Sequence, residues 1–258
     1  MSLFCRHIFR RNTMISILMP IYNGIEFMDE SITSILEQTY NHWELLVGIN
    51  GHTENSIVYQ KAKEYEKVSD KIRVFDFYEI KGKSNTLNKM LPLCRFNYVA
   101  LLDVDDVWHK KKLEIQSHYF VNNYDVIGTL GIWFGDKKGM PNIPPGDISA
   151  FNFSLVNPII NSSAIIKKDL CYWNVIEDGV EDYDLWLNLR KNGRRFYNCK
   201  EILVKHRIHE SSAFNSKGNN NKVDNLLNKY GFKSREKPSR KLSKIIAPKI
   251  KKMAMALY

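Results

Sequence analysis

The stretch NYVALLDVDD, residues 97–106, decides how the chain folds. An apolar run ends here in three aspartates, as expected for a strand that is buried on both faces and carries polar groups beyond its carboxyl end. Similar apolar runs precede it at residues 15–20, 44–49 and 71–77. Each run is followed by a stretch with the helical spacing of apolar residues. This alternation predicts an α/β domain whose mostly parallel sheet is wound by right-handed crossovers.

The amphipathic stretches predict the helices that flank this sheet. They cover residues 27–38, 57–68, 84–91 and 110–120. Ligands of such sheets bind beyond the carboxyl ends of the strands. The residues expected to form a site are therefore 20–24, 50–53 and 103–106.

The rhythm changes after about residue 124, where shorter strands and turns predict a second, mixed layer. A further helix is expected at residues 181–193, with Gly193 as its stop. The expected organisation is an N-terminal extension at 1–13, one domain at 14–214 with halves at 14–123 and 124–214, and a polar hinge and basic tail at 215–258.

Composition narrows the class of protein. The 258 residues are 44% hydrophobic and 26% charged, which are the values of an ordinary globular protein. The four cysteines are too far apart in the sequence for a metal knuckle or a disulfide framework, so a reducing, cytoplasmic setting is expected. No apolar run reaches the length of a transmembrane helix. Arginines before residue 14 imitate a signal peptide, but the apolar run that follows is only about eight residues long.

The net charge of +10 is concentrated in the C-terminal tail. Residues 233–258 hold nine basic residues and one acidic residue, so the rest of the chain is nearly neutral and no nucleic-acid surface is expected. Apolar residues in the tail recur at helical spacing, which is typical of a helix lying on an anionic membrane surface. Pro248 interrupts this pattern, and a solvated tail is the alternative. The protein is thus expected in the cytoplasm, with peripheral association at the inner membrane face as an option.

The acidic cluster Asp103, Asp105 and Asp106 carries the sharpest chemical signal. Carboxylates that repel one another at a strand end are stabilised by a shared cation, and their hard oxygens select Mg²⁺ or Mn²⁺. A solvated acidic turn is the plain alternative. A phosphatase with an aspartate nucleophile is another, although its motif normally ends the first strand. Dinucleotide oxidoreduction is excluded because no GxGxxG follows any strand.

Seven segments in a fixed order resemble glycosyltransferase family 2, whose members are inverting, nucleotide-sugar-dependent enzymes of the GT-A fold. The resemblance covers residues 14 to about 214. It is carried by MISILMPIYNG, SITSILEQTYNHWELLVGING, KSNTLNKML, YVALLDVDDVWHKKKLE, NPIINSSAIIKK, EDYDLWLNLRKNG and KHRIHESS.

The resemblance implies a donor site and a metal site in the first half of the domain. Asp103 would contact the ribose, while Asp105 and Asp106 would hold Mn²⁺ or Mg²⁺ on the diphosphate, with His209 as a further ligand or else a structural histidine. Arg207 would bind phosphate, and Lys83 would lie near the donor or else be a surface lysine. The residues implied to line the nucleotide pocket are Pro20, Ile21, Tyr22, Asn23 and Asn50.

The acidic pair Glu181-Asp182 matches the pair that the family uses at the acceptor, with Asp182 as the general base. An inverting transfer needs one carboxylate to take the proton of the attacking hydroxyl. Without the family, a cluster that caps the helix N-terminus is the simpler interpretation. The chain also departs from the family, because Ile49-Asn50 replaces the two aspartates that many members carry, which leaves the base preference open.

The sequence therefore predicts transfer of a single sugar from a UDP-sugar to a glycan or lipid-linked acceptor in the synthesis of cell-surface polysaccharide or lipopolysaccharide. Single transfer is expected because the Gln-x-x-Arg-Trp motif of the processive synthases is absent after residue 186. The alternative is an inactive relative that serves as a nucleotide- or membrane-binding scaffold.

Overall fold

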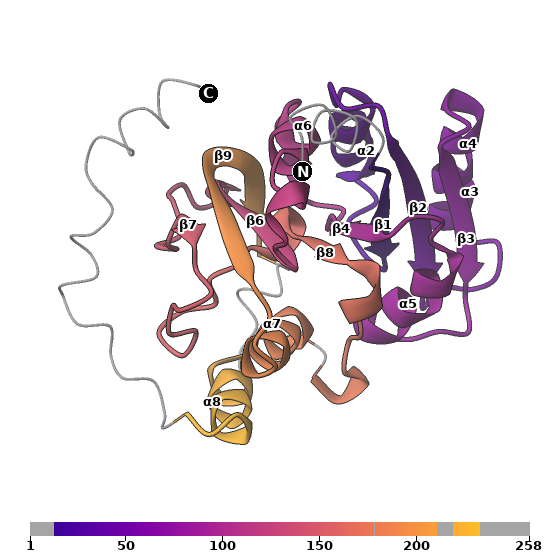
Figure 1. Cartoon of the computed structure of the whole chain (residues 1–258). Coiled ribbons are helices and arrows are strands. Elements are labelled where there is room, and N and C mark those ends of the chain that lie inside the picture. The colour runs from indigo at the N-terminus through magenta and orange to yellow at the C-terminus, as the bar shows by residue number, and fades with distance from the viewer. Residues whose placement is uncertain (1–12, 178, 211–218, 233–258) are drawn as a thin grey trace.

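The computed structural model describes residues 13–177, 179–210 and 219–232 (Figure 1). Four strands alternate with helices in the first part of the chain. They are β1 (Ile15–Ile21), α2 (Met28–Leu36), β2 (Trp43–Asn50), α3 (Ile57–Lys63), α4 (Tyr65–Val68), β3 (Ile72–Phe77), α5 (Lys83–Met90) and β4 (Tyr98–Leu101). The expected alternation of strands and helices is confirmed, except that the predicted helix 57–68 is split into α3 and α4.

Shorter strands and helices make up the second part. They are β5 (Val107–Trp108), α6 (Lys112–Ser117), β6 (Val126–Gly135), β7 (Gly146–Asp147), β8 (Ile165–Lys167), α7 (Glu181–Lys191), β9 (Phe196–Ile208) and α8 (Asn219–Lys229). Single 3-10 turns lie at Leu91–Leu93, Phe120–Asn122, Asn161–Ser163, Lys168–Leu170 and Val175–Glu177.

One continuous sheet joins both parts, in the order β3-β2-β1-β4-β8-β6-β9-β5, with β7 paired to β9. The first four strands pair in parallel, as predicted. Beyond β4 the pairing is mixed, because β8 is antiparallel to both of its neighbours whereas β6 and β9 are parallel to each other. The mixed second layer expected from the sequence is thus an extension of the same sheet.

Helices cover both faces of this sheet (Figure 1). Apolar residues of α2, α3 and α6 pack on one face with those residues of β1 and β2 that point the same way, such as Ile17 and Leu45. Residues of α5, α7 and α8 pack on the other face, against Leu18 and Leu46. Side chains that alternate along a strand point to opposite faces, so burial of both faces explains the continuous apolar runs.

Local signals for helix ends agree with the structure. The Ser56 hydroxyl accepts a hydrogen bond from the Tyr59 amide and caps α3. α7 ends at Lys191, and Gly193 adopts a φ of +70°, as expected for its predicted role as the stop.

The C-terminal region shows one difference from the expectation. Asn219–Asn221, three residues of the expected polar hinge, form the first turn of α8. Residues 1–12 and the basic tail 233–258 lie outside the described residues, so the membrane-surface helix stays a prediction. None of the described helices is long and apolar enough to cross a bilayer.

Candidate active site

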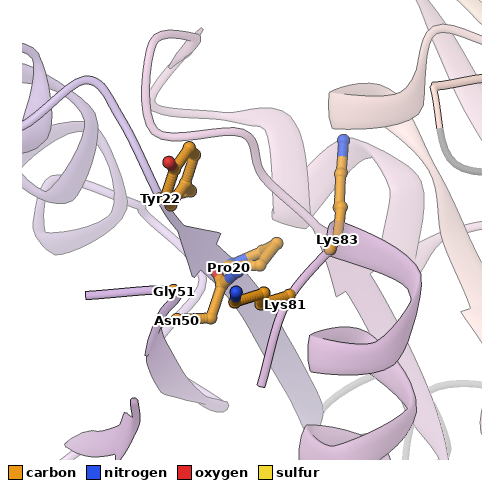
Figure 2. A pocket seen from close by; sticks show the side chains of 7 residues that line it. Pro20, Tyr22, Asn50, Gly51, Lys81 and Lys83 are labelled. Atoms are coloured by element: carbon orange, nitrogen blue, oxygen red, sulfur yellow. The ribbon is translucent and has the colours of Figure 1, made fainter. Parts of the chain in front are cut away.

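A cleft of about 520 Å³ opens at the carboxyl ends of β1 and β2 and beside the loop that follows β3 (Figure 2). This is the edge of the sheet at which the parallel topology places ligands. The cleft is lined by Pro20, Tyr22, Asn50, Gly51, Lys81, Gly82 and Lys83.

The aromatic ring of Tyr22 and the side-chain amide of Asn50 lie in this cleft, at the ends of β1 and β2. Asn50 is the last residue of β2 and is 3% exposed, whereas Tyr22 follows β1 and is 56% exposed. Gly51 has a φ of +72°, and a Cβ atom there would lie 2.9 Å from the Tyr22 ring. Only glycine therefore allows the chain after β2 to pass under this ring. The His52 ring lies beside the ring of Tyr22, with 5.5 Å between their centroids.

Two lysines, Lys81 just before α5 and Lys83 at its first position, point in different directions (Figure 2). Lys81 lies near Pro20 and Asn50, whereas Lys83 points away from them. The Lys83 Nζ lies 2.5 Å from Asp103 Oδ1 and 3.4 Å from Glu181 Oε1. Burial opposes its charge, but the Asp103 and Glu181 carboxylates outweigh burial and raise the pKa of Lys83.

Asp103 is held by groups from two segments, the start of α5 with Lys83 and the 3-10 turn at Asn161–Ser163. Its Oδ2 accepts a hydrogen bond from the Asn161 amide at 3.0 Å, and its backbone N–H donates to the Ser162 hydroxyl at 3.1 Å. Burial raises the pKa of its carboxyl, but Lys83 and Asn161 outweigh burial and lower the pKa below the usual range. Asp103 is thus a charged group that is oriented before any ligand arrives.

Asp105 and Asp106 lie in different environments although they are neighbours. The Asp106 side chain is fully buried, and its oxygens accept from His206 Nδ1 at 3.0 Å and from the Arg207 N–H at 2.9 Å. Asp105 Oδ2 lies 3.0 Å from His209 Nε2, and this carboxylate is partly exposed. Burial and then the neighbouring Asp106 raise the pKa of Asp105 to about 6.

The end of β9 therefore holds the acidic loop in place. The Arg207 Nε donates to the Asp105 carbonyl at 2.9 Å, while its guanidinium packs over the rings of Phe27 and Phe134 and pairs with Glu30. These contacts cover the guanidinium, and its side chain is 14% exposed. In this arrangement the guanidinium of Arg207 binds groups of the protein itself.

The acidic pair begins α7 on the far side of Lys83. Glu181 Oε2 accepts from the Gly179 N–H at 2.6 Å, and Asp182 Oδ2 accepts from the Asn157 amide at 3.0 Å. Burial and then the adjacent Glu181 raise the pKa of Asp182 to about 6, against the opposing effects of Lys83 and Asn157. A carboxylate with such a pKa is suited to accept a proton near neutral pH.

A divalent metal fits one part of this site. Across the described ranges, no three carboxylate, imidazole or thiolate groups converge in a metal-binding arrangement. Asp105 and His209 nevertheless form a partly exposed carboxylate and imidazole pair. Burial and then the neighbouring carboxylates raise the pKa of Asp105, and a cation bound beside it would favour the ionised form. These two residues fit a metal completed by water and a ligand phosphate, whereas the oxygens of Asp106 are already used.

The structure brings some of the sequence-predicted residues together and separates others. Four of the residues predicted to form the donor site line the cleft: Pro20, Tyr22, Asn50 and Lys83. The other two predicted pocket residues do not, because Ile21 is fully buried in the core and Asn23 is exposed outside the lining. Asp103 and Glu181 contact Lys83, which lines the cleft, and Asp182 follows Glu181 in α7. Arg207 lies behind the acidic loop.

Sequence reasoning did not single out Lys81 and Gly82, which line the cleft, or His206 as the partner of Asp106. The first two follow the carboxyl end of β3, so the rule that indicated residues 20–24 and 50–53 would also have found them. No local signal marks the role of His206.

Comparisons with known proteins agree with this geometry. The family model described as Glycosyl transferase family 2 matches residues 16–163. The O-antigen biosynthesis glycosyltransferase WbnJ of Escherichia coli is 31% identical over 78% of this chain and 82% of its own length. The Escherichia coli UDP-Glc:alpha-D-GlcNAc-diphosphoundecaprenol beta-1,3-glucosyltransferase WfgD is 29% identical over 79% of this chain and 81% of its own length.

Solved structures share the fold at low sequence identity. S. aureus TarS 1-349 in complex with UDP-GlcNAc superposes with a TM-score of 0.70 at 14% identity and covers 84% of this chain, which spans 65% of that TarS chain. The mannosyltransferase PcManGT from Pyrobaculum calidifontis, solved with GDP-Man and Mn²⁺, has a TM-score of 0.64 at 14% identity over 85% of this chain and 63% of its own. The predicted GT-A architecture is confirmed.

Proposed function

This chain belongs to glycosyltransferase family 2, and from that membership we propose that it transfers a single sugar from a UDP-sugar to a lipid-linked or glycan acceptor with inversion at the anomeric carbon. The observation that carries the proposal is the cleft itself. Lys83, which lines the cleft, contacts both the charged Asp103 and Glu181, and Asp182, which follows Glu181, has a raised pKa.

The first half of the site suits a nucleoside diphosphate. The exposed ring of Tyr22 offers a face for a base, and the Asn50 amide can hydrogen-bond the edge of a uracil. Lys81 supplies positive charge to the same cleft, which favours an anionic ligand. A UDP-sugar is the donor named for WfgD and present in the TarS complex, and it is the donor we propose here.

Asp105 and His209 would hold Mn²⁺ or Mg²⁺. When bound, this cation supplies charge that stabilises the leaving diphosphate. The Mn²⁺ in the PcManGT complex supports a divalent metal in this fold. The Asp106 carboxylate, enclosed by His206 and Arg207, would act behind this site by orienting the loop, which revises its expected role as a ligand.

Asp182 would take the proton of the acceptor hydroxyl while its oxygen attacks C1 of the sugar. The new bond from oxygen to C1 forms on the face opposite the diphosphate, the bond from C1 to the diphosphate oxygen breaks, and UDP leaves with the bonding electrons. One displacement inverts the configuration at C1. The Asn157 amide on Asp182 Oδ2 fixes the direction in which the carboxylate points.

The acceptor belongs to the envelope of the cell in this proposal. WbnJ is an O-antigen biosynthesis enzyme, and the name of WfgD includes a sugar linked to diphosphoundecaprenol. An acceptor of this class, a GlcNAc-diphospho-lipid, is the first to test. A phosphatase is not supported, because the acidic cluster follows the fourth strand of the sheet and not the first.

The decisive experiment measures UDP release from a panel of UDP-sugars by the purified full chain, with and without Mn²⁺ and a GlcNAc-diphospho-lipid. We expect release that requires both, and a product with the anomeric configuration opposite to that of the donor by NMR. Asp182→Asn should reduce transfer by about 10³-fold with UDP binding retained. A product of retained configuration would contradict the mechanism, and failure to bind any nucleoside diphosphate would favour the scaffold.

A further inference from the structure

One ammonium group connects the two sides of the site. Lys83 Nζ contacts Asp103, which follows β4, and also Glu181, which begins α7. The side chains of Lys83, Asp103 and Glu181 are 31%, 24% and 7% exposed. The three groups thus form a partly enclosed chain of charges that runs from the donor side to the acceptor side of the cleft.

Glu181 depends on this contact for charge balance. Its Oε2 is taken by the Gly179 N–H, and its Oε1 faces Lys83. Within the described residues, Lys83 makes the one ion pair of Glu181. A buried carboxylate that loses its cationic partner must move toward water or take up a proton.

A change at Glu181 would reach Asp182 directly. Glu181 ties the backbone of Gly179 to the first turn of α7, and Asp182 is the next residue of that turn. The Asp182 carboxylate has its own partner in Asn157, so its position requires the turn and Asn157 to stay in register. Glu181 therefore fixes the backbone from which the proposed base projects.

Lys83 is itself held on a firm support. It is the first residue of α5, whose Leu87 and Met90 are buried in the core. Asn88 of the same helix donates to the Trp173 carbonyl at 2.6 Å and accepts from its N–H at 3.0 Å. Helix α5 is thus attached to the chain segment that leads into α7 at a second point besides Lys83.

We propose that Lys83 is a positioning residue for the acceptor side of the site: its ammonium holds Glu181, and through Glu181 the first turn of α7, in the orientation that lets Asp182 take the acceptor proton. The proposal rests on the proposed function for Asp182. It differs from a role in donor binding alone, which would make Lys83 equivalent to Lys81 of the preceding loop.

The test compares Lys83→Met with Lys81→Met, since the described residues show no ion pair from Lys81 to an acceptor-side carboxylate. We expect Lys83→Met to reduce kcat/KM for the acceptor at least tenfold while the Kd for UDP with Mn²⁺ rises less than threefold. Lys81→Met should raise the Kd for UDP and leave KM for the acceptor unchanged. Lys83→Arg, which keeps the charge, should recover part of the transfer rate.

A double-mutant cycle isolates the contact. The Lys83→Met/Glu181→Gln protein should transfer no more slowly than Lys83→Met alone, because both changes remove the same interaction. The proposal would be overturned if the losses in transfer rate of the two single variants multiply in the double variant. It would also be overturned if the Kd for UDP rises as much as the transfer rate falls, which would leave Lys83 as a donor ligand.

Hydrogen exchange gives a readout that needs no activity, so it separates this proposal from the proposed function. The Gly179 amide and the first turn of α7 should exchange at least threefold faster in Lys83→Met and Glu181→Gln than in the unmodified chain or Lys81→Met. Unchanged exchange in both variants would overturn the positioning role even if the chain proves to be an active transferase.

Discussion

The ammonium of Lys83, a residue that lines the cleft, lies 2.5 Å from the Asp103 carboxylate of the acidic loop. This pair keeps Asp103 ionised, since Lys83 is the main group that lowers its pKa against burial. The donor side of the site therefore has its charges in place before a ligand binds. Preorganised charge of this kind does not have to be reoriented during the reaction.

Transfer should depend on pH through Asp182. Its pKa is raised to about 6, and a general base acts only when it is deprotonated, so kcat/KM for the acceptor should fall about tenfold per pH unit below pH 6. An aspartate with the ordinary pKa of 3.8 would keep its activity down to about pH 4. The profile is measured from pH 5 to 8 at saturating donor, with UDP affinity measured at each pH as the control. A flat profile between pH 7 and 5 would rule out Asp182 as a base with this pKa.

Asp105→Asn should impair ligand binding, whereas Asp106→Asn should lower stability. Asp105 is the proposed metal ligand, so Asp105→Asn should stay folded and lose Mn²⁺-dependent UDP binding in calorimetry. Asp106 is fully buried against His206, whose side chain is 25% exposed. Asp106 outweighs the effect of burial and raises the pKa of His206 to about 9, so Asp106→Asn leaves this imidazolium without its carboxylate. We expect a loss of about 3 kcal/mol in the free energy of unfolding. Equal stability of the two variants would contradict this division of roles.

The Tyr22 ring should contribute to nucleotide affinity through its face. Tyr22→Ala should weaken UDP binding about tenfold, whereas Tyr22→Phe should keep most of the affinity because the ring remains. Tyr172→Ala serves as the control, since Tyr172 is 65% exposed and lies outside the lining of the cleft. Calorimetric titration with UDP and Mn²⁺ measures all three. An equal loss in Tyr22→Phe and Tyr22→Ala would point to the hydroxyl as the binding group.

Lys112 should make stability rise with pH. Its side chain is fully buried, its Nζ donates to Gln116 at 2.8 Å and lies 3.8 Å from the centroid of the Trp108 ring, and burial lowers its pKa well below 10.5. The unfolded chain therefore binds a proton that the folded chain does not, and stability increases up to the unfolded pKa by about 1.4 kcal/mol per pH unit.

Lys112→Met should lose this slope, while Lys110→Met, an exposed neighbour, should keep it. Chemical denaturation at pH 7, 8 and 9 gives the free energy of unfolding for each protein. Parallel pH dependence in Lys112→Met and the unmodified chain would show that Lys112 is charged in the folded state.

The order of strands and helices in the first half of the fold was readable from local periodicity. Each apolar run became a strand, and three of the four amphipathic stretches each became one helix, because burial of both sheet faces leaves its mark on consecutive residues. The second half was less readable. β8 is three residues long and antiparallel on both sides, and its place beside β4 depends on pairing with residues far away in the sequence.

The sequence by itself determined that acidic residues would follow a buried strand, that Tyr22 and Asn50 would lie at the same edge, and that Glu181-Asp182 would begin a helix. Only the tertiary structure decided which carboxylate each partner holds: Asp106 is closed off by His206, and Lys83 is shared by Asp103 and Glu181. The physical reason is that these partners meet through long-range strand pairing and helix packing. The burial and the charge compensation of these side chains depend on residues that are far apart in the sequence, so no local pattern predicts them.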